Sequence, residues 1–395
     1  MRRSAPLAAA AALLSLTACA PSEPEPEPVP VLELVADGLA FPNDLADLGD
    51  GRLLIGDQVG RINVLKDGEI LAEPFLDLTD VVQRSGSPEL GLSGFAPHPG
   101  FAENGRVLVY YTVDADADAT EHTAITGVLA EFTVDATGAA LDRASERVIL
   151  RHHGGKEHVG GHMAFDDEGL LYLGLGAPTF SDFAQDPFDL RGSVIRIDVD
   201  SATGDPYAIP ADNPFADGTA GAPEVYTYGH RNPWRIHWDA EVGLLIPEPM
   251  WTDKSQEVNL AAPGANFGYP QDIVEDSCYD NDAAEPRPIC TEPFTPPVVE
   301  YGTGAICAGA VIYRGSELPQ FAGKAIVIDW AGAVMVAEPG EGRWSHEELD
   351  LPFPDEAPLQ GRLWSIDVDA EGEVYLMTSE LAADGAGAVY RLTAA

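Results

Sequence analysis

The chain has 395 residues and a formal net charge of −43, with 65 acidic residues against 22 Lys and Arg. The acidic residues are spread along the whole length, and the clusters of Lys and Arg that could neutralise a phosphate backbone are missing, so the composition excludes a nucleic-acid-binding function. This length allows one large all-β domain or two ordinary domains.

The N-terminal residues 1–18 have the pattern of an export signal. Arg2 and Arg3 precede an apolar run at 6–16 that is too short to span a bilayer. The sequence Leu-Thr-Ala-Cys that follows resembles a bacterial lipobox, which implies cleavage before Cys19 and acylation of its sulfur; the alternative is a coincidental cysteine. Residues 19–30 predict a stiff, Pro- and Glu-rich tether. We therefore expect an exported lipoprotein that faces the periplasm or the cell surface and touches the membrane only through its lipid.

Short apolar runs, each associated with a Gly-containing turn, recur between residues 31 and 395 and predict β-strands. Six units contain the runs 45–56, 95–111, 162–174, 235–238, 309–313 and 363–368. No helical periodicity of useful length appears after the tether. A repeat of this length predicts an all-β fold, a six-bladed β-propeller, rather than a β-sandwich with its shorter regular spacing. Residues 31–35 are expected to close the last blade.

Two loops place ionisable and amide side chains beside glycines at the ends of predicted strands. Residues 157–165 contain His158, and residues 228–234 contain Arg231 and Asn232. On a rigid β scaffold these side chains predict a general base and an anion clamp at the mouth of one pocket. The alternative is a zinc site, although no fourth ligand is evident. Its ligands would be His153, His158 and His162.

These loops and several further motifs resemble the glucose/sorbosone dehydrogenase family, soluble sugar dehydrogenases that use pyrroloquinoline quinone (PQQ) on a six-bladed propeller. The similarity covers about residues 35–393. The matching motifs are residues 89–101, 157–165, 191–198, 209–215, 228–234, 256–259, 264–270 and 313–315. The resemblance implies oxidation of an aldose-type sugar at C1 to the lactone. His158 would be the general base, and Glu157 would fix its tautomer and stabilise the imidazolium.

The resemblance also implies which residues bind the cofactor. Arg231 and Asn232 would bind the quinone oxygens of PQQ and neighbouring polar atoms. Glu89 matches a further position that contacts the cofactor, and Arg362 matches an arginine that contacts one of its carboxylates.

Three tryptophans depart from the best-known glucose enzymes of the family. Trp330 stands where those enzymes have a lysine to a PQQ carboxylate, and Trp364 stands where they have a second arginine. Trp251 and Thr252 replace the Gly-Pro pair whose carbonyls hold a calcium ion against the cofactor. Each lost charge-assisted contact would weaken PQQ binding by roughly 1.5–3 kcal/mol.

A structural calcium ion is implied by the same resemblance. Glu257 matches an acidic ligand and the carbonyl of Phe267 matches a second one. Ca²⁺ needs several oxygens, so Asp276 or Asp280 could complete the shell. The alternative for Glu257 is a solvated carboxylate at a strand end.

Export makes disulfides possible. Cys278 and Cys290 flank a polar loop that a bridge would restrain, whereas Cys307 lies in an apolar run and is expected to be a buried free thiol. The three cysteines allow three single bridges, so the pairing stays open.

Three functions follow from these observations. The first is PQQ-dependent oxidation of a small sugar, with electrons passing to a soluble carrier or a quinone. The second is a non-catalytic propeller of the same family that binds a ligand or a protein and has lost PQQ. The third is a metal-dependent sugar-lactone hydrolase on a similar scaffold.

Overall fold

The structure is a computed structural model. It describes residues 27–84, 87, 89–115, 120, 123–178, 182–200, 204–250, 254–270, 293–302, 306–351, 362–380 and 385–395. The expected signal peptide, Cys19, Trp251, Asp276, Asp280 and the pair Cys278 and Cys290 lie outside these ranges. Within them, no helix has the length and apolar character needed to cross a bilayer.

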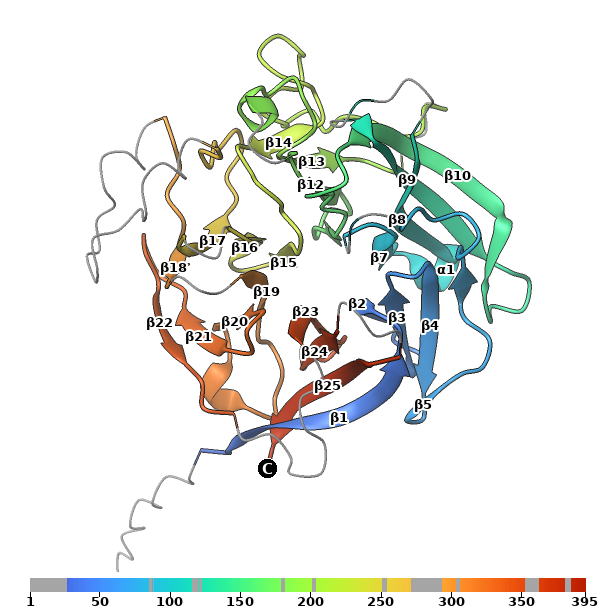
Figure 1. Cartoon of the computed structure of the whole chain (residues 1–395), viewed down its shortest axis with the longest axis vertical. Coiled ribbons are helices and arrows are strands. Elements are labelled where there is room, and N and C mark those ends of the chain that lie inside the picture. The colour runs from blue at the N-terminus through green and yellow to red at the C-terminus, as the bar shows by residue number, and fades with distance from the viewer. Residues whose placement is uncertain are drawn as a thin grey trace, which may run out of the picture.

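The described strands form six antiparallel sheets arranged around a central axis, which confirms the predicted six-bladed β-propeller (Figure 1). The innermost strands of the blades contact one another in a closed ring. They are β2 (Pro42–Asp47), β7 (Leu92–Pro97), β11 (Met163–Phe165), β15 (His237–Asp239), β19 (Cys307–Ile312) and β23 (Arg362–Val368).

Each of the first five blades continues outward from its inner strand as an antiparallel meander. The outer strands of the first two blades are β3 (Arg52–Asp57), β4 (Arg61–Lys66), β5 (Glu69–Ile70), β6 (Leu76–Asp77), β8 (Arg106–Asp114), β9 (Ile125–Val134) and β10 (Leu141–Gly154). Those of the next three are β12 (Leu171–Leu175), β13 (Ser193–Ile197), β14 (Val225–Tyr228), β16 (Gly243–Glu248), β17 (Gln256–Leu260), β18 (Val299–Tyr301), β20 (Ala325–Asp329), β21 (Val334–Glu338) and β22 (Ser345–Glu348). Helical segments are short: α1 (Phe101–Asn104), η2 (Asp182–Gln185) and η5 (Pro319–Phe321).

The sixth blade is closed by the N-terminal segment, as the sequence predicts. Its strands β24 (Val374–Ser379) and β25 (Gly387–Ala394) follow β23, and β1 (Pro30–Leu39) pairs antiparallel with β25 at the outer edge (Figure 1). Pairing the first and last described strands in one sheet leaves no gap in the ring, so the blades cannot open at that point without breaking β-pairing.

The hydrophobic core is divided into layers that lie between neighbouring blades. Leu54 and Phe95, for example, share a buried cluster of the first two blades, and Ile328 and Leu376 share one of the last two. Because side chains alternate along a strand, each blade buries apolar residues on both faces against its neighbours. This packing fixes the positions of the inner strands, whose starting ends carry the loops singled out in the sequence.

Candidate functional site

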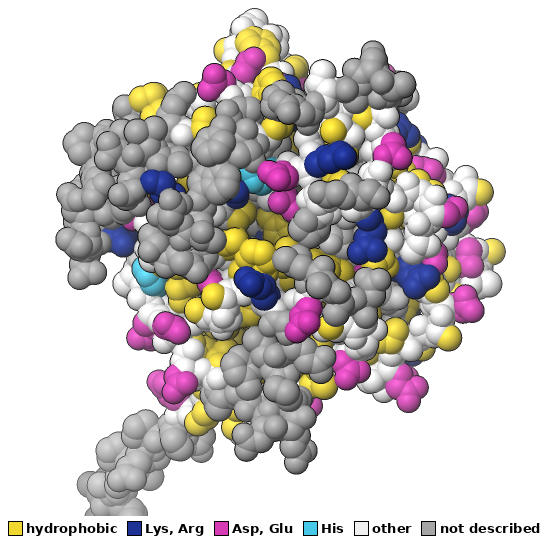
Figure 2. Space-filling view, in the orientation of Figure 1, with side chains coloured by type: hydrophobic (Ala, Val, Ile, Leu, Met, Phe, Trp, Pro, Cys, Tyr) yellow, Lys and Arg dark blue, Asp and Glu magenta, His cyan; other side chains and the backbone are white. Residues whose placement is uncertain are grey.

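A cavity of about 270 Å³ lies near the central axis, at the end where the inner strands begin. Hydrophobic side chains gather at the centre of the face seen in Figure 2. The lining residues are Glu89, Arg231, Asn232, Trp234, Pro249, Met250, Ile306, Cys307, Ala308, Trp330 and Trp364. Three of the residues predicted to bind the cofactor therefore lie on one wall. Cys307 is a buried free thiol, as expected.

His158 lies in the loop between β10 and β11 and has a left-handed backbone, with φ of 58°. This conformation is uncommon for a residue with a side chain and marks a position held by its surroundings. The chain passes so close to Gly176 that a Cβ there would lie 2.1 Å from the His158 carbonyl oxygen. The main-chain N–H of His158 donates to Oε2 of Glu89 at 2.6 Å, which ties the loop to the cavity wall.

The tautomer of His158 is fixed by a carbonyl group. Nδ1 lies 2.8 Å from the carbonyl oxygen of Ala177, and because a carbonyl only accepts, Nδ1 carries the proton and Nε2 keeps its lone pair. Burial, assisted by the positive charge of Arg231, lowers the pKa of His158 to about 3, so the ring is neutral at ordinary pH. His158 is not part of the cavity lining, and the residue as a whole is 5% exposed.

The sequence predicted that Glu157 fixes the tautomer of His158, and the structure corrects this prediction. Its side chain is exposed, and Nδ1 of His158 is bonded to the Ala177 carbonyl instead. A buried backbone carbonyl orients an imidazole more strictly than an exposed, flexible carboxylate does, because it has no rotamers of its own. Glu157 remains close enough to Arg231 for their charges to interact.

Asn232 and Arg231 are held by a network of buried groups. The side-chain amide of Asn232 donates to Oε2 of Glu89 at 3.3 Å and its oxygen accepts the N–H of Gly160 at 3.0 Å. Nη1 of Arg231 donates to the carbonyl of Pro249 at 2.5 Å. Burial raises the pKa of Glu89, while the charge of Arg231 favours its ionised form.

Two further residues support this wall and were missed in the sequence. Glu248, at the end of β16, accepts the main-chain N–H of Asn232 at 2.5 Å and lies 3.0 Å from Nδ1 of His230. His230 in turn lies 2.9 Å from the Thr227 hydroxyl. His230 lies next to Arg231 in the loop 228–234, so the sequence could have indicated its role. Glu248 lies on β16, and only the fold brings it to this loop.

Another part of the cavity lining is aromatic. The rings of Trp330 and Trp364 are 5.2 Å apart, those of Trp234 and Trp364 are 5.9 Å apart, and both pairs meet edge to face. Arg362 is exposed, with its guanidinium carbon 4.5 Å from the centroid of Trp330. The two positions where the family's positive charges were expected to be missing therefore form an apolar wall with one arginine stacked on Trp330.

The residues expected to bind calcium lie away from the cavity lining. Glu257 is buried on β17, opposite Glu248 on one side and Glu300 on the other, and all three side chains are buried. Phe267 packs its ring 4.9 Å from His230. Within the described ranges, Glu257 belongs to no set of three His, Cys, Asp or Glu side chains that converge on one point.

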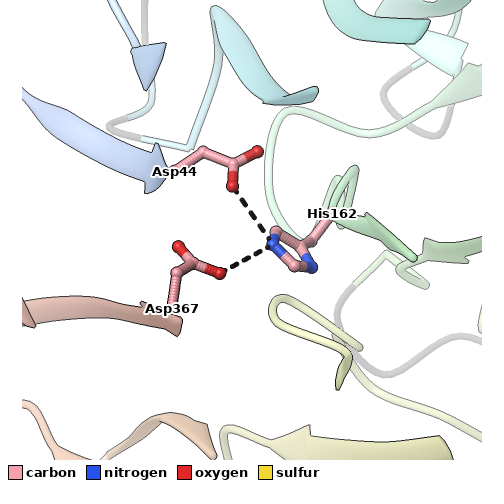
Figure 3. Close-up of side chains that lie close together, drawn as sticks. All are labelled: Asp44, His162 and Asp367. Carbon is pink, nitrogen blue, oxygen red and sulfur yellow. Dashed lines mark ion pairs between the residues drawn. The ribbon is translucent and has the colours of Figure 1, made fainter. Parts of the chain in front are cut away.

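A second polar cluster joins β2 and β23, the inner strands of two neighbouring blades, to the residue just before β11. Nε2 of His162 is 3.2 Å from Asp44 of β2 and 3.4 Å from Asp367 of β23 (Figure 3). Burial opposes protonation of His162, but the two carboxylates outweigh it and raise the pKa to about 9. The carboxylates keep a proton on Nε2. The Ile236 N–H lies 3.3 Å from Nδ1 and favours the neutral ring, but this long contact is outweighed by the two carboxylates. Because the ring stays charged below about pH 9, the cluster is described as a buried ion pair between His162 and the two carboxylates.

The zinc alternative is likewise corrected. The three histidines have different partners: His153 is exposed and lies 3.3 Å from the Thr126 hydroxyl, His158 bonds Ala177, and His162 pairs with the two aspartates. They do not converge on one point among the described residues.

Comparison with known proteins identifies the family that this chain resembles and several of its relatives. The family model of glucose/sorbosone dehydrogenases matches residues 39–391. The chain is 29% identical over 373 residues to the Hedgehog-interacting protein of Homo sapiens, covering 88% of this chain and 50% of that protein. It is 26% identical over 300 residues to the aldose sugar dehydrogenase YliI of Escherichia coli, covering 75% and 76%.

The fold is shared with solved structures. The PQQ-bound form of an aldose sugar dehydrogenase from Streptomyces coelicolor superimposes with a TM-score of 0.69 at 23% identity, covering 93% of this chain and 99% of that one. Among curated relatives, the chain spans only about half the length of the human protein.

Proposed function

Because the chain belongs to the glucose/sorbosone dehydrogenase family, we propose that it oxidises an aldose-type sugar at C1 to the lactone with PQQ as cofactor. The observation that carries this proposal is His158, whose left-handed backbone, fixed tautomer and neutral ring leave an unprotonated Nε2 in a loop that is bonded to Glu89 of the cavity wall. A histidine without a chemical role has no need of all three features, and strained residues cluster at functional sites.

The residues present fit one end of PQQ and its flat ring. Arg231 and Asn232 provide a guanidinium and an amide for quinone oxygens, and Glu89 holds Asn232 and the His158 loop in place. Trp330 and Trp364 offer apolar surface to a planar ring. Arg362 at the rim would bind a carboxylate. When bound, PQQ would supply the acceptor for a hydride from the sugar carbon.

The contribution of the protein is to bind, orient and deprotonate. Nε2 of His158 would take the proton of the sugar hydroxyl, and the resulting imidazolium would keep its Nδ1–H bond to Ala177. The Glu248–His230 pair holds Asn232 in position and so preserves the polar wall. The aromatic wall excludes water, which strengthens the electrostatic interactions of Arg231.

The test is turnover by purified protein with saturating PQQ, Ca²⁺ and an artificial electron acceptor on a broad panel of aldoses. We expect lactone formation from at least one of them. Complete inactivity on the panel, with PQQ bound, would contradict the proposal.

A second candidate is favoured by one observation: the cavity has an apolar wall at Trp330 and Trp364, where a tricarboxylate would need positive charge. In this alternative the propeller binds a ligand or protein and has lost PQQ. Binding of an aldose or another small ligand in the cavity without any redox change would support it.

We further propose that the protein binds a calcium ion and is attached to a membrane through a lipid. Glu257, with the buried carboxylates on either side of it, supplies negative charge for a calcium ion whose shell would extend beyond the described residues. Export and attachment through acylated Cys19 are inferred from the N-terminal sequence alone. Replacing Cys19 by Ser should move the protein from the membrane fraction to the soluble fraction, and unaltered fractionation would disprove the lipid anchor.

A further inference from the structure

The two walls of the cavity differ in chemistry. Glu89, Arg231 and Asn232 make one wall, and the remaining lining residues are apolar, with three tryptophans among them. Of the described residues that line the cavity, Arg231 alone carries a positive charge.

The charge of Arg231 is already engaged within the protein. Its Nη1 donates to the Pro249 carbonyl at 2.5 Å, and its strongest electrostatic partner is the carboxylate of Glu89. Glu89 in turn is bonded by the N–H of His158 and by Asn232. The polar wall therefore presents directed hydrogen-bonding groups but little net positive charge to a ligand.

The aromatic part of the lining attracts an anion still less. A carboxylate placed against the ring faces of Trp330 or Trp364 would lose its water and meet no positive charge there; the donors nearby are the two indole N–H groups, which are neutral, buried and without a partner among the described residues. Arg362 could pair with one carboxylate, but it is exposed and stacked on Trp330, so this contact would be screened by salt. A flat conjugated ring, in contrast, gains by packing against the indoles.

We propose that Trp330 and Trp364 select the ligand of this cavity, which holds a flat ortho-quinone by aromatic contact and prefers uncharged edges to a tricarboxylate. This selection rests on the proposed function, because the ligand is taken to be a quinone, and it deepens that function by stating the class of quinone. PQQ then binds the wild-type protein more weakly than a quinone with the same ring and no carboxylate charge.

The test compares PQQ with its trimethyl ester, which has the same ring and no carboxylate charge. Binding is followed by quenching of tryptophan fluorescence and by calorimetry, at low and high salt. We expect the ester to bind at least about tenfold more tightly than PQQ, with little dependence on salt, because charge-assisted contacts contribute little. Trp330→Lys should reverse the order and make PQQ binding sensitive to salt.

Phe188→Arg is the matched control, because Phe188 is 57% exposed and does not line the cavity. This variant adds a positive charge to the protein without changing the cavity lining. Trp330→Lys replaces a partly buried side chain, so the folding of this variant is checked by circular dichroism. Arg362→Gln is an independent variant that should weaken the binding of PQQ and leave the binding of the ester unchanged. Tighter binding of PQQ than of its ester by the wild type, with strong salt dependence, would overturn the selection and leave the proposed function intact. Failure of both quinones to bind, in wild type and variant alike, would overturn the proposed function as well.

Discussion

The cavity and the Asp44–His162–Asp367 cluster are both built on the ring of inner strands, yet they treat a buried histidine in opposite ways. His158 is neutral, faces Arg231 and has its pKa lowered to about 3. His162 faces two carboxylates that raise its pKa to about 9. The first arrangement leaves a lone pair available for chemistry, whereas the second uses the imidazole to join blades. Charge environment, rather than burial, separates the two roles.

Exchanging His158 for glutamine gives the largest expected effect. His158→Gln should lower turnover by about 10²–10⁴-fold, because a positioned general base contributes that much. The melting temperature and quinone affinity should change little. The exposed His153→Gln serves as the control and should keep full activity. Normal turnover of the His158→Gln variant would show that His158 is not the general base.

The same exchange at His162 should act on stability. His162→Gln leaves Asp44 and Asp367 facing each other without a positive partner between them, and breaking a buried pair typically destabilises by about 3–5 kcal/mol. We expect a clear fall in the thermal midpoint, with turnover per folded molecule retained. A variant that melts like the wild type but has lost activity would show that the cluster belongs to the active site.

Stability against pH should also distinguish the two histidines. The raised pKa of His162 gives stabilisation that is complete below about pH 6.5, its unfolded value, and is lost as pH rises through about 9. The lowered pKa of His158 has the opposite sign, since stability is lost as pH falls from about 6.5 towards 3. The free energy of unfolding should therefore fall between about pH 6 and 10, and His162→Gln should remove this fall. A slope that persists in this variant would place the titrating group elsewhere.

Calcium removal is expected to have a smaller effect. A ligand present at a hundredfold excess over its Kd stabilises by about 2.7 kcal/mol. The thermal midpoint should be higher in millimolar Ca²⁺ than in EDTA, and Glu257→Gln should abolish the difference. Glu347→Gln, an exposed change on β22, is the control. Equal midpoints in calcium and EDTA would argue against the site.

The sequence predicts the elements of this molecule better than their contacts. The strand runs, the closing segment and the grouping of Glu89 with Arg231 and Asn232 follow from local patterns and family motifs. The partner of His158 could not be predicted in this way, because the Ala177 carbonyl is a backbone group with no side-chain signature. The cluster of Asp44, His162 and Asp367 could not be predicted either. It depends on closure of the ring, which brings together Asp44 on β2 and Asp367 on β23, more than three hundred positions apart in the sequence.

The most direct test of the central claim is the absorption spectrum of PQQ-loaded protein, recorded without oxygen or acceptor, before and after an aldose is added. If the propeller oxidises the sugar with His158 as base, the absorption of the oxidised quinone should be lost within seconds in the wild type and far more slowly in His158→Gln. Bound PQQ whose spectrum stays unchanged with every aldose, at concentrations where the sugar saturates the cavity, would contradict the account.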